Sequence, residues 1–279
     1  MIRGTVLAAG VALGLLGAGC GSPARHVAAP VVASPTPTVS PSAVVLTTPP
    51  TLPPPPAPSP SLTHGQGGHS ACPATLAGQL ADAGPGTQIV TVDAQSAAST
   101  AAAVALWQRS GGCWSLAAGP WPGRVGATGV SDHHREGDGS TPSGVYAFGP
   151  VIYGIAASPG VRYSYHRLVC GDWWDEDPAS VTYNTFRHVA CGTAPPFHGK
   201  SEALWEVTRA YQRFAVVDYN AHPVVPGAGS AVFVHDDTWG PTIGCVSVAA
   251  ANLDRLLVWL DPRQSPTIVI GTEAEIRRL

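Results

Sequence analysis

The chain has 279 residues and a formal net charge of −3 at neutral pH, and only 12% of its residues are charged. The length allows one or two domains. A weakly acidic chain offers no basic field for nucleic acid, so we expect no nucleic-acid partner.

Residues 1–20 resemble an export signal. Arg3 supplies the positive end, and the apolar run that follows, residues 6–16, is too short to span a membrane comfortably. Small residues then lead into Cys20, as in a bacterial lipobox, which predicts that Cys20 is lipidated and is the chain's one attachment to a membrane. The alternative is an ordinary secreted protein that is cut nearby.

Residues 21–70 are dominated by Pro, Ser, Thr, Ala and Val and show no apolar period. This composition predicts an extended, disordered linker. The folded domain is expected over residues 71–279.

Within that domain, apolar patterns predict many strands and a few helices, and therefore a mixed, β-rich fold. Short alternating runs predict strands over 88–93, 113–116, 125–129, 145–149, 213–220, 230–235 and 267–271. Ala-rich or amphipathic patterns predict helices over 72–83, 94–109, 201–214 and 250–260.

Residues 158–196 are predicted to be rich in loops. Trp173 and Trp174 precede three acidic residues there. This patch could stack on a sugar, but we favour the interpretation that the two tryptophans are a buried pair. His133 and His134 lie near acidic residues but fit no zinc spacing, so neither a metal nor a cofactor is expected.

The stretch from Gly229 to Val248 carries the clearest chemistry. An alternating strand ends on His235, a turn-rich loop follows, and Cys245 comes ten positions later. An imidazole can take the proton of a thiol, and the thiolate is the reactive nucleophile. Gly244 allows a close approach of the backbone, so the N–H groups of Gly244 and Cys245 are candidates to face an oxyanion. A buried free cysteine beside a capping histidine is the alternative.

The same stretch resembles the active-site signature of the YkuD-type L,D-transpeptidases, in which a strand-end His is followed by a Ser/Thr-x-Gly-Cys turn. Here those elements are Val-Phe-Val-His235 and Pro-Thr-Ile-Gly-Cys245. Four other segments match the same branch of the family, and with this stretch they span most of residues 72–272: residues 135–145, 177–184, 198–204 and 216–220. Two positions depart from the common pattern. Ile243 stands where many members have His, and Ser247 stands where many have Arg or Asn.

The resemblance implies a β-sandwich or barrel-like core with peripheral helices. It implies that Cys245 is the nucleophile, that His235 is its general base, and that Thr242 and Gly244 shape the turn and the oxyanion site. A third group, often a backbone carbonyl in this family, orients the histidine. The remaining cleft candidates are His198, Tyr219 and Asn220.

The function that the resemblance implies is transfer of an acyl group between peptidoglycan stem peptides, through a cysteine thioester, to form 3→3 cross-links. It requires no cofactor. The protein is then exported, and either lipid-anchored facing the cell wall or secreted to it. Two alternatives stay open: a carboxypeptidase or endopeptidase with water as acceptor, and a non-catalytic lipoprotein that binds the wall.

Six cysteines in an exported chain are expected to be mostly paired. With Cys20 lipidated and Cys245 kept free, four remain. We predict the disulfides Cys72–Cys113 and Cys170–Cys191, although the sequence alone allows other pairings.

Overall fold

The structure is a computed structural model of the chain and describes residues 72–82, 84–199 and 201–279. The predicted signal with Cys20 and the predicted linker lie outside these residues. Within them, no helix has the length and apolar character needed to cross a membrane.

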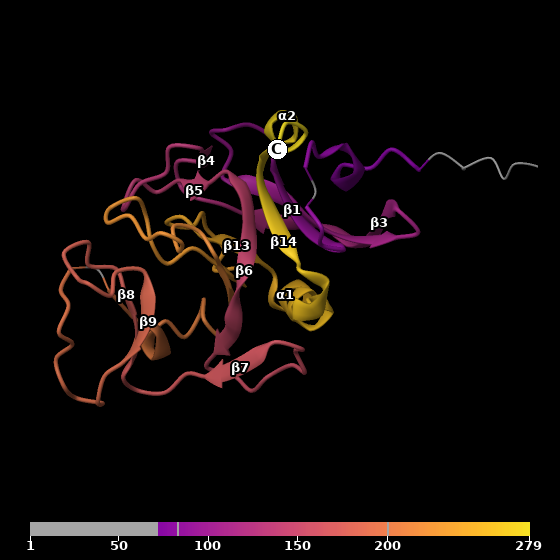
Figure 1. Ribbon diagram of the computed structural model, residues 1–279. Coiled ribbons are helices and arrows are strands. Elements are labelled where there is room, and N and C mark those ends of the chain that lie inside the picture. The colour runs from indigo at the N-terminus through magenta and orange to yellow at the C-terminus, as the bar shows by residue number, and fades with distance from the viewer. Residues whose placement is uncertain (1–71, 83, 200) are drawn as a thin grey trace, which may run out of the picture. The chain divides into compact units, whose positions relative to one another are not determined.

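Eight strands form a closed barrel (Figure 1). Their order is β11-β12-β13-β3-β2-β1-β14-β6, and pairing of β6 with β11 closes the ring. The barrel strands are β1 (Gln88–Ala94), β2 (Ala101–Ser110), β3 (Cys113–Arg124), β6 (Gly144–Gly154), β11 (Phe214–Val217), β12 (Phe233–Asp236), β13 (Val246–Val248) and β14 (Thr267–Thr272). A further strand, β7 (Ser164–Arg167), pairs with β6 outside the ring. This arrangement confirms the predicted β-rich fold with a barrel-like core.

Side chains that alternate along the strands fill the barrel. Val90 and Val92 of β1 and Ile268 and Ile270 of β14 are buried in one cluster, as the period of two in a strand requires. The predicted C-terminal helix is confirmed as α1 (Ala250–Trp259), which buries three leucines in the same cluster: Leu253, Leu256 and Leu257. Each buried leucine stabilises the fold by about 1.5–3 kcal/mol.

A small sheet lies beside the barrel (Figure 1). Its strands, in spatial order, are β10 (Glu202–Ala203), β8 (Asp172–Asp175) and β9 (Thr185–His188). Phe214 of β11 and Phe233 of β12 pack in a second cluster with Trp174 of β8 and with Leu204 and Tyr211. Strands β11 and β12 are therefore buried on both faces.

The remaining elements are short. They are the paired strands β4 (Val130–Ser131) and β5 (Thr141–Pro142), the 3-10 helices η1 (Ala77–Gln79), η2 (Leu204–Glu206) and η3 (Pro262–Gln264), and the C-terminal helix α2 (Glu273–Ile276).

Both predicted disulfides are confirmed, Cys72–Cys113 and Cys170–Cys191. Cys245 is the one free cysteine of the described residues. Stable disulfides are typical of exported proteins, in agreement with the export signal predicted from the sequence.

Three predicted helices are wrong. Residues 94–109 form the end of β1 and most of β2, because pairing with β1 and β3 on both sides outweighs the helix propensity of alanine. Of the described residues 72–82, only Ala77–Gln79 is helical, as one 3-10 turn. Residues 201–214 form β10, η2 and a single α-turn from Val207 to Tyr211 before β11 begins. Their apolar spacing reflects packing of an irregular segment into the second cluster.

The tryptophan patch is half buried. Trp174 is buried and its Nε1 donates to Asn184 Oδ1 at 3.0 Å, whereas Trp173 is partly exposed. The region predicted to be loop-rich holds three short strands, β7, β8 and β9.

Candidate active site

The barrel places His235 and Cys245 on the same side of one strand pair. Strands β12 and β13 are parallel, with His235 opposite Ser247 and Val234 opposite Val246. Val234 and Val246 point into the barrel core, whereas Phe233 and Cys245 pack in the second cluster outside it. Because side chains alternate along a strand, His235 shares the outer face with Phe233 and Cys245.

His235 is held in one tautomer. The residue is only 6% exposed, and its Nδ1 lies 2.8 Å from the carbonyl oxygen of Asp236. A carbonyl only accepts hydrogen bonds, so Nδ1 carries the proton and Nε2 keeps a free lone pair. Burial lowers the pKa of His235, which keeps the ring neutral. The Asp236 carbonyl is thus the orienting group that the sequence did not identify.

Cys245 is protonated at rest. Its Sγ donates to the Ala231 carbonyl at 3.2 Å, and the Phe233 N–H donates to Sγ at 3.4 Å. Burial, and then the charges of Glu202 and Glu176, raise the pKa of the thiol. A thiol in this setting needs a base at the moment of attack.

The Thr242–Cys245 turn is fixed by hydroxyl groups. Thr242 Oγ1 donates to the Cys245 carbonyl at 2.6 Å, and Thr141 Oγ1 donates to the same oxygen at 3.1 Å. The Gly244 N–H donates to Thr242 Oγ1 at 3.3 Å. The Cys245 N–H makes no hydrogen bond to any residue that the structure describes, so it is available to an oxyanion.

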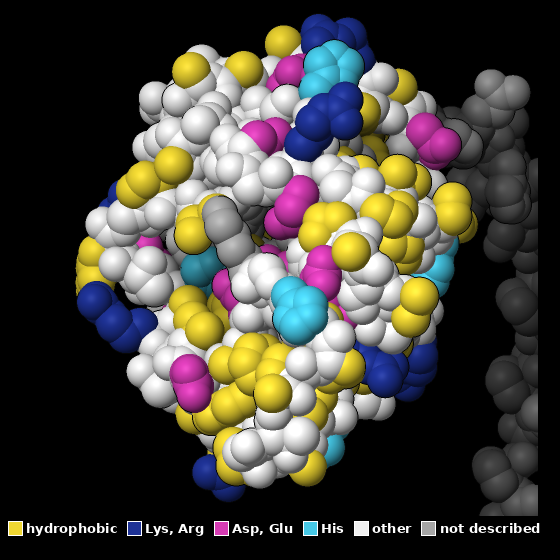
Figure 2. Space-filling model, turned by 90° about the vertical axis from the view of Figure 1, so that its left-hand side faces the viewer, with side chains coloured by type: hydrophobic (Ala, Val, Ile, Leu, Met, Phe, Trp, Pro, Cys, Tyr) yellow, Lys and Arg dark blue, Asp and Glu magenta, His cyan; other side chains and the backbone are white. Residues whose placement is uncertain are grey.

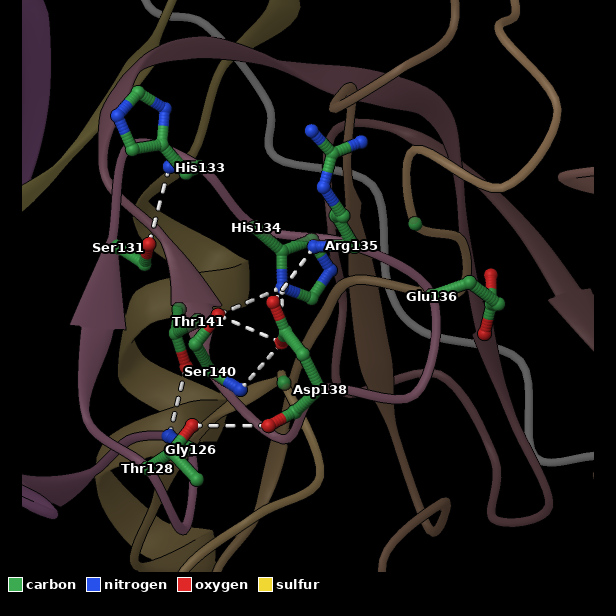
Figure 3. Close-up of polar contacts among 12 residues, drawn as sticks. Gly126, Thr128, Ser131, His133, His134, Arg135, Glu136, Asp138, Ser140 and Thr141 are labelled. Carbon is green, nitrogen blue, oxygen red and sulfur yellow. Dashed lines mark hydrogen bonds and ion pairs between the residues drawn. The ribbon is translucent and has the colours of Figure 1, made fainter.

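A histidine from a distant segment supports the turn. His134 is buried, and its Nδ1 lies 3.0 Å from Ser140 Oγ and 3.1 Å from Asp138 Oδ1 (Figure 3). The ring lies against Gly244, whose added Cβ would be 3.5 Å from His134 Cε1. Burial lowers the pKa of His134, although Asp138 acts in the opposite direction. The described residues contain no cluster of His, Cys, Asp and Glu suited to a metal.

A cavity of about 160 Å³ opens beside the thiol. It is lined by His134, Glu136, Gly137, Glu176, Glu202, Ser230, Ala231, Ile243, Gly244 and Cys245. Figure 2, which views the side of the molecule that carries β8 and β9, shows acidic side chains around a hollow. Three carboxyl groups therefore border the Cys245 thiol.

The three carboxylates differ in their partners. Glu136 Oε2 accepts hydrogen bonds from Ser230 Oγ at 2.6 Å and from the Tyr183 hydroxyl, and Glu202 accepts one from the Tyr211 hydroxyl. Glu176 Oε1 is buried and has no partner among the described residues.

Burial raises the pKa of two of these three carboxyl groups, those of Glu176 and Glu202. Burial, with the neighbouring charges of Glu202 and Glu136, raises the pKa of Glu176 to about 9. Burial also raises the pKa of Glu202. Burial and these neighbouring charges therefore favour the protonated form of Glu176 at neutral pH.

The other sequence candidates lie apart from this cavity. His198 is exposed, and its N–H donates to Asp177 Oδ2. The Tyr219 hydroxyl donates to the Ala228 carbonyl, and Asn220 Nδ2 donates to the carbonyls of Val225 and Gly229, so both residues hold the loop before β12.

The two positions that depart from the family pattern have opposite surroundings. Ile243 is 83% exposed at the cavity rim. Ser247 is fully buried opposite His235, and its Oγ has no partner among the described residues.

Sequence reasoning missed the carboxylates. Glu136 and Glu202 fall in two of the segments in which the sequence resembles the family, residues 135–145 and 198–204, and Glu176 directly precedes a third. Charged residues are rare in this chain, so acidic residues in or beside these segments could have been recognised as site candidates from the sequence.

Comparison of the chain with protein-family models, with characterised proteins and with solved structures gave no match.

Proposed function

We propose that the chain is a cysteine acyltransferase of the L,D-transpeptidase type, acting on peptidoglycan stem peptides. The observation that carries the proposal is the locked tautomer of His235, whose unprotonated Nε2 shares the outer face of the β12–β13 pair with the free thiol of Cys245. The resemblance in sequence supplies the substrate class.

In the first half-reaction His235 Nε2 accepts the thiol proton as Sγ attacks the carbonyl carbon of the third stem residue. The Cys245 N–H faces the developing oxyanion. The bond to the terminal amino acid then breaks, the departing amine takes the proton from His235, and a thioester remains. In the second half-reaction the amine of another stem attacks the thioester, the carbon–sulfur bond breaks, and the sulfur recovers a proton through His235.

The test uses the full chain with a disaccharide-tetrapeptide, and mass spectrometry follows the products beside the Cys245→Ala variant. We expect a cross-linked dimer that requires Cys245, preceded by an acyl-enzyme whose mass adduct maps to the Cys245 peptide. Loss of the terminal residue without a dimer assigns the chain to hydrolysis with water as acceptor. Absence of both product and acyl-enzyme overturns the proposal and favours a wall-binding role.

Export of the protein is part of the same proposal. The two disulfides support it, because such bonds form and persist outside the cytoplasm. Attachment through Cys20 is checked by the mass of the N-terminal peptide isolated from membranes.

A further inference from the structure

The carboxylate cavity beside Cys245 lacks a counter-charge among the residues that the structure describes. No Lys or Arg is part of its described lining, and its one histidine, His134, is turned toward Asp138 and Ser140 through Nδ1. Buried carboxyl groups without a cation are costly, and they protonate or attract a positive group.

Of the three carboxyl groups in the cavity, that of Glu176 indicates most clearly that a ligand binds there. Its Oε1 is sealed from solvent and accepts no hydrogen bond from a described residue, whereas buried carboxylate oxygens are normally satisfied. Its backbone is held in place, since the Glu176 N–H donates to Ser201 Oγ at 3.0 Å. The backbone of Glu176 is therefore fixed, and its Oε1 lacks a hydrogen-bond donor.

We propose that this cavity is a subsite for a primary ammonium group of the substrate, and that the occupied cavity is the state in which Cys245 reacts. This inference rests on the proposed acyl transfer. An ammonium group brings three donors and one positive charge, which match three carboxylates at the walls. A cavity of about 160 Å³ has room for the end of an alkylammonium side chain.

The link to reactivity is electrostatic. The charges of Glu202 and Glu176 act with burial to raise the pKa of the Cys245 thiol, so a cation between them and the sulfur acts in the opposite direction. The empty cavity keeps the thiol protonated and unreactive. The filled cavity favours loss of the proton to His235.

The test measures the charge preference of Cys245 toward three methanethiosulfonate reagents of similar size: aminoethyl (cationic), ethyl (neutral) and sulfonatoethyl (anionic). The full chain is used, and modification is read on the Cys245 peptide by mass spectrometry so that Cys20 does not interfere. Each rate is divided by the rate of a small free thiol. We expect the cationic reagent to exceed the anionic one by roughly tenfold or more.

Glu176→Gln and Glu202→Gln each remove one ionisable carboxyl group with little change in shape. Each is expected to reduce the cationic-to-anionic ratio by about threefold or more. Glu206→Gln is the matched control, because Glu206 is exposed and lies four residues after Glu202. A ratio near one in the unaltered chain, or equal ratios in all three variants, overturns the subsite.

A second arm adds propylammonium at constant ionic strength and follows the neutral reagent. We expect a saturable acceleration in the unaltered chain that Glu176→Gln weakens, and no acceleration by tetramethylammonium. Lys200, the chain's only lysine, lies outside the described residues, so Lys200→Met is included. If a charge preference appears only in Lys200→Met, the chain's own lysine fills the cavity and the subsite for substrate is overturned.

These outcomes separate the subsite from the proposed function. Charge preference without any acyl transfer retains the cation site and rejects the transpeptidase. Acyl transfer with no charge preference, and with full activity in Glu176→Gln, retains the enzyme and rejects the subsite.

Discussion

The hydrogen bond from His235 to the Asp236 carbonyl decides what the imidazole can do. Nδ1 is committed as a donor, so proton transfer must use Nε2. Burial lowers the pKa of His235 below its ordinary value of 6.5, so the neutral, basic form persists into weak acid. We predict that the acid limb of the pH profile for kcat/KM lies below pH 6.5. An acid limb above that value contradicts this assignment.

Replacing His235 tests its assignment as the general base directly. His235→Asn retains a donor for the Asp236 carbonyl but has no basic nitrogen, so we expect kcat/KM to fall by about 10²–10⁴-fold. His133→Asn is the control, because His133 is exposed and should change neither activity nor stability. Unfolding curves of both variants establish whether a loss of activity reflects chemistry or folding.

Gly244 directly precedes Cys245 in the turn. A side chain at Gly244 would therefore disturb the backbone next to the thiol. Its φ is +152°, and a Cβ there would lie 3.1 Å from the Ser140 carbonyl oxygen. We predict that Gly244→Ala destabilises the fold by about 1–3 kcal/mol and lowers kcat more than KM changes. Gly240→Ala is the matched control, since a Cβ at Gly240 meets nothing within 4 Å. Equal effects of the two variants in urea unfolding would contradict this account.

At the scale of elements, patterns that one segment carries by itself were predictable. The strand before Cys245 and the helix α1 both depend on residues close in sequence. The wrong helices have the opposite origin, because residues 94–109 gain their pairing from β1 and β3. The carboxylate cavity escaped prediction for the same reason. Glu136, Glu176 and Glu202 come from three segments that only the tertiary fold brings together.

Strands β7, β8 and β9 are joined by one buried carboxylate. Asp172 is fully buried and accepts hydrogen bonds from His188 Nδ1 at 2.7 Å, from His166 Nε2 at 2.8 Å and from the Val169 N–H at 2.8 Å. Burial acts to raise the pKa of Asp172, but these hydrogen bonds outweigh it and lower the pKa below 3.8. The folded state therefore binds this proton less readily than the unfolded chain does.

The sign of the pH dependence follows from that lowered pKa. The stability that Asp172 contributes is complete above the pKa of the unfolded chain and is lost as the pH falls through the folded pKa. We predict that Asp172→Asn costs about 2–4 kcal/mol near neutral pH and that the cost shrinks below about pH 4. Urea unfolding from pH 3 to 7 measures it. Asp132→Asn, at an exposed pair with His133, should leave stability unchanged at every pH.

At the scale of the whole molecule, the candidate site lies between two layers with different tasks. The barrel fixes His235 and Cys245 through the register of β12 and β13. The small sheet carries Glu202 in β10 and Glu176 just after β8. The Cys170–Cys191 disulfide closes the segment that holds Glu176, whereas Cys72–Cys113 joins the start of the described chain to β3 on the barrel.

This division of tasks predicts that the two disulfides are equivalent for stability but not for the site. Removing either pair with alanines should lower the free energy of unfolding by about 2–4 kcal/mol, because each closes a loop in the unfolded chain. Only Cys170→Ala/Cys191→Ala should also reduce the preference of Cys245 for cationic reagents, since it alone loosens the segment that positions Glu176. Cys72→Ala/Cys113→Ala is the control for stability. If both variants lose the preference equally, the carboxylates depend on global stability, and the small sheet has no separate part in positioning them.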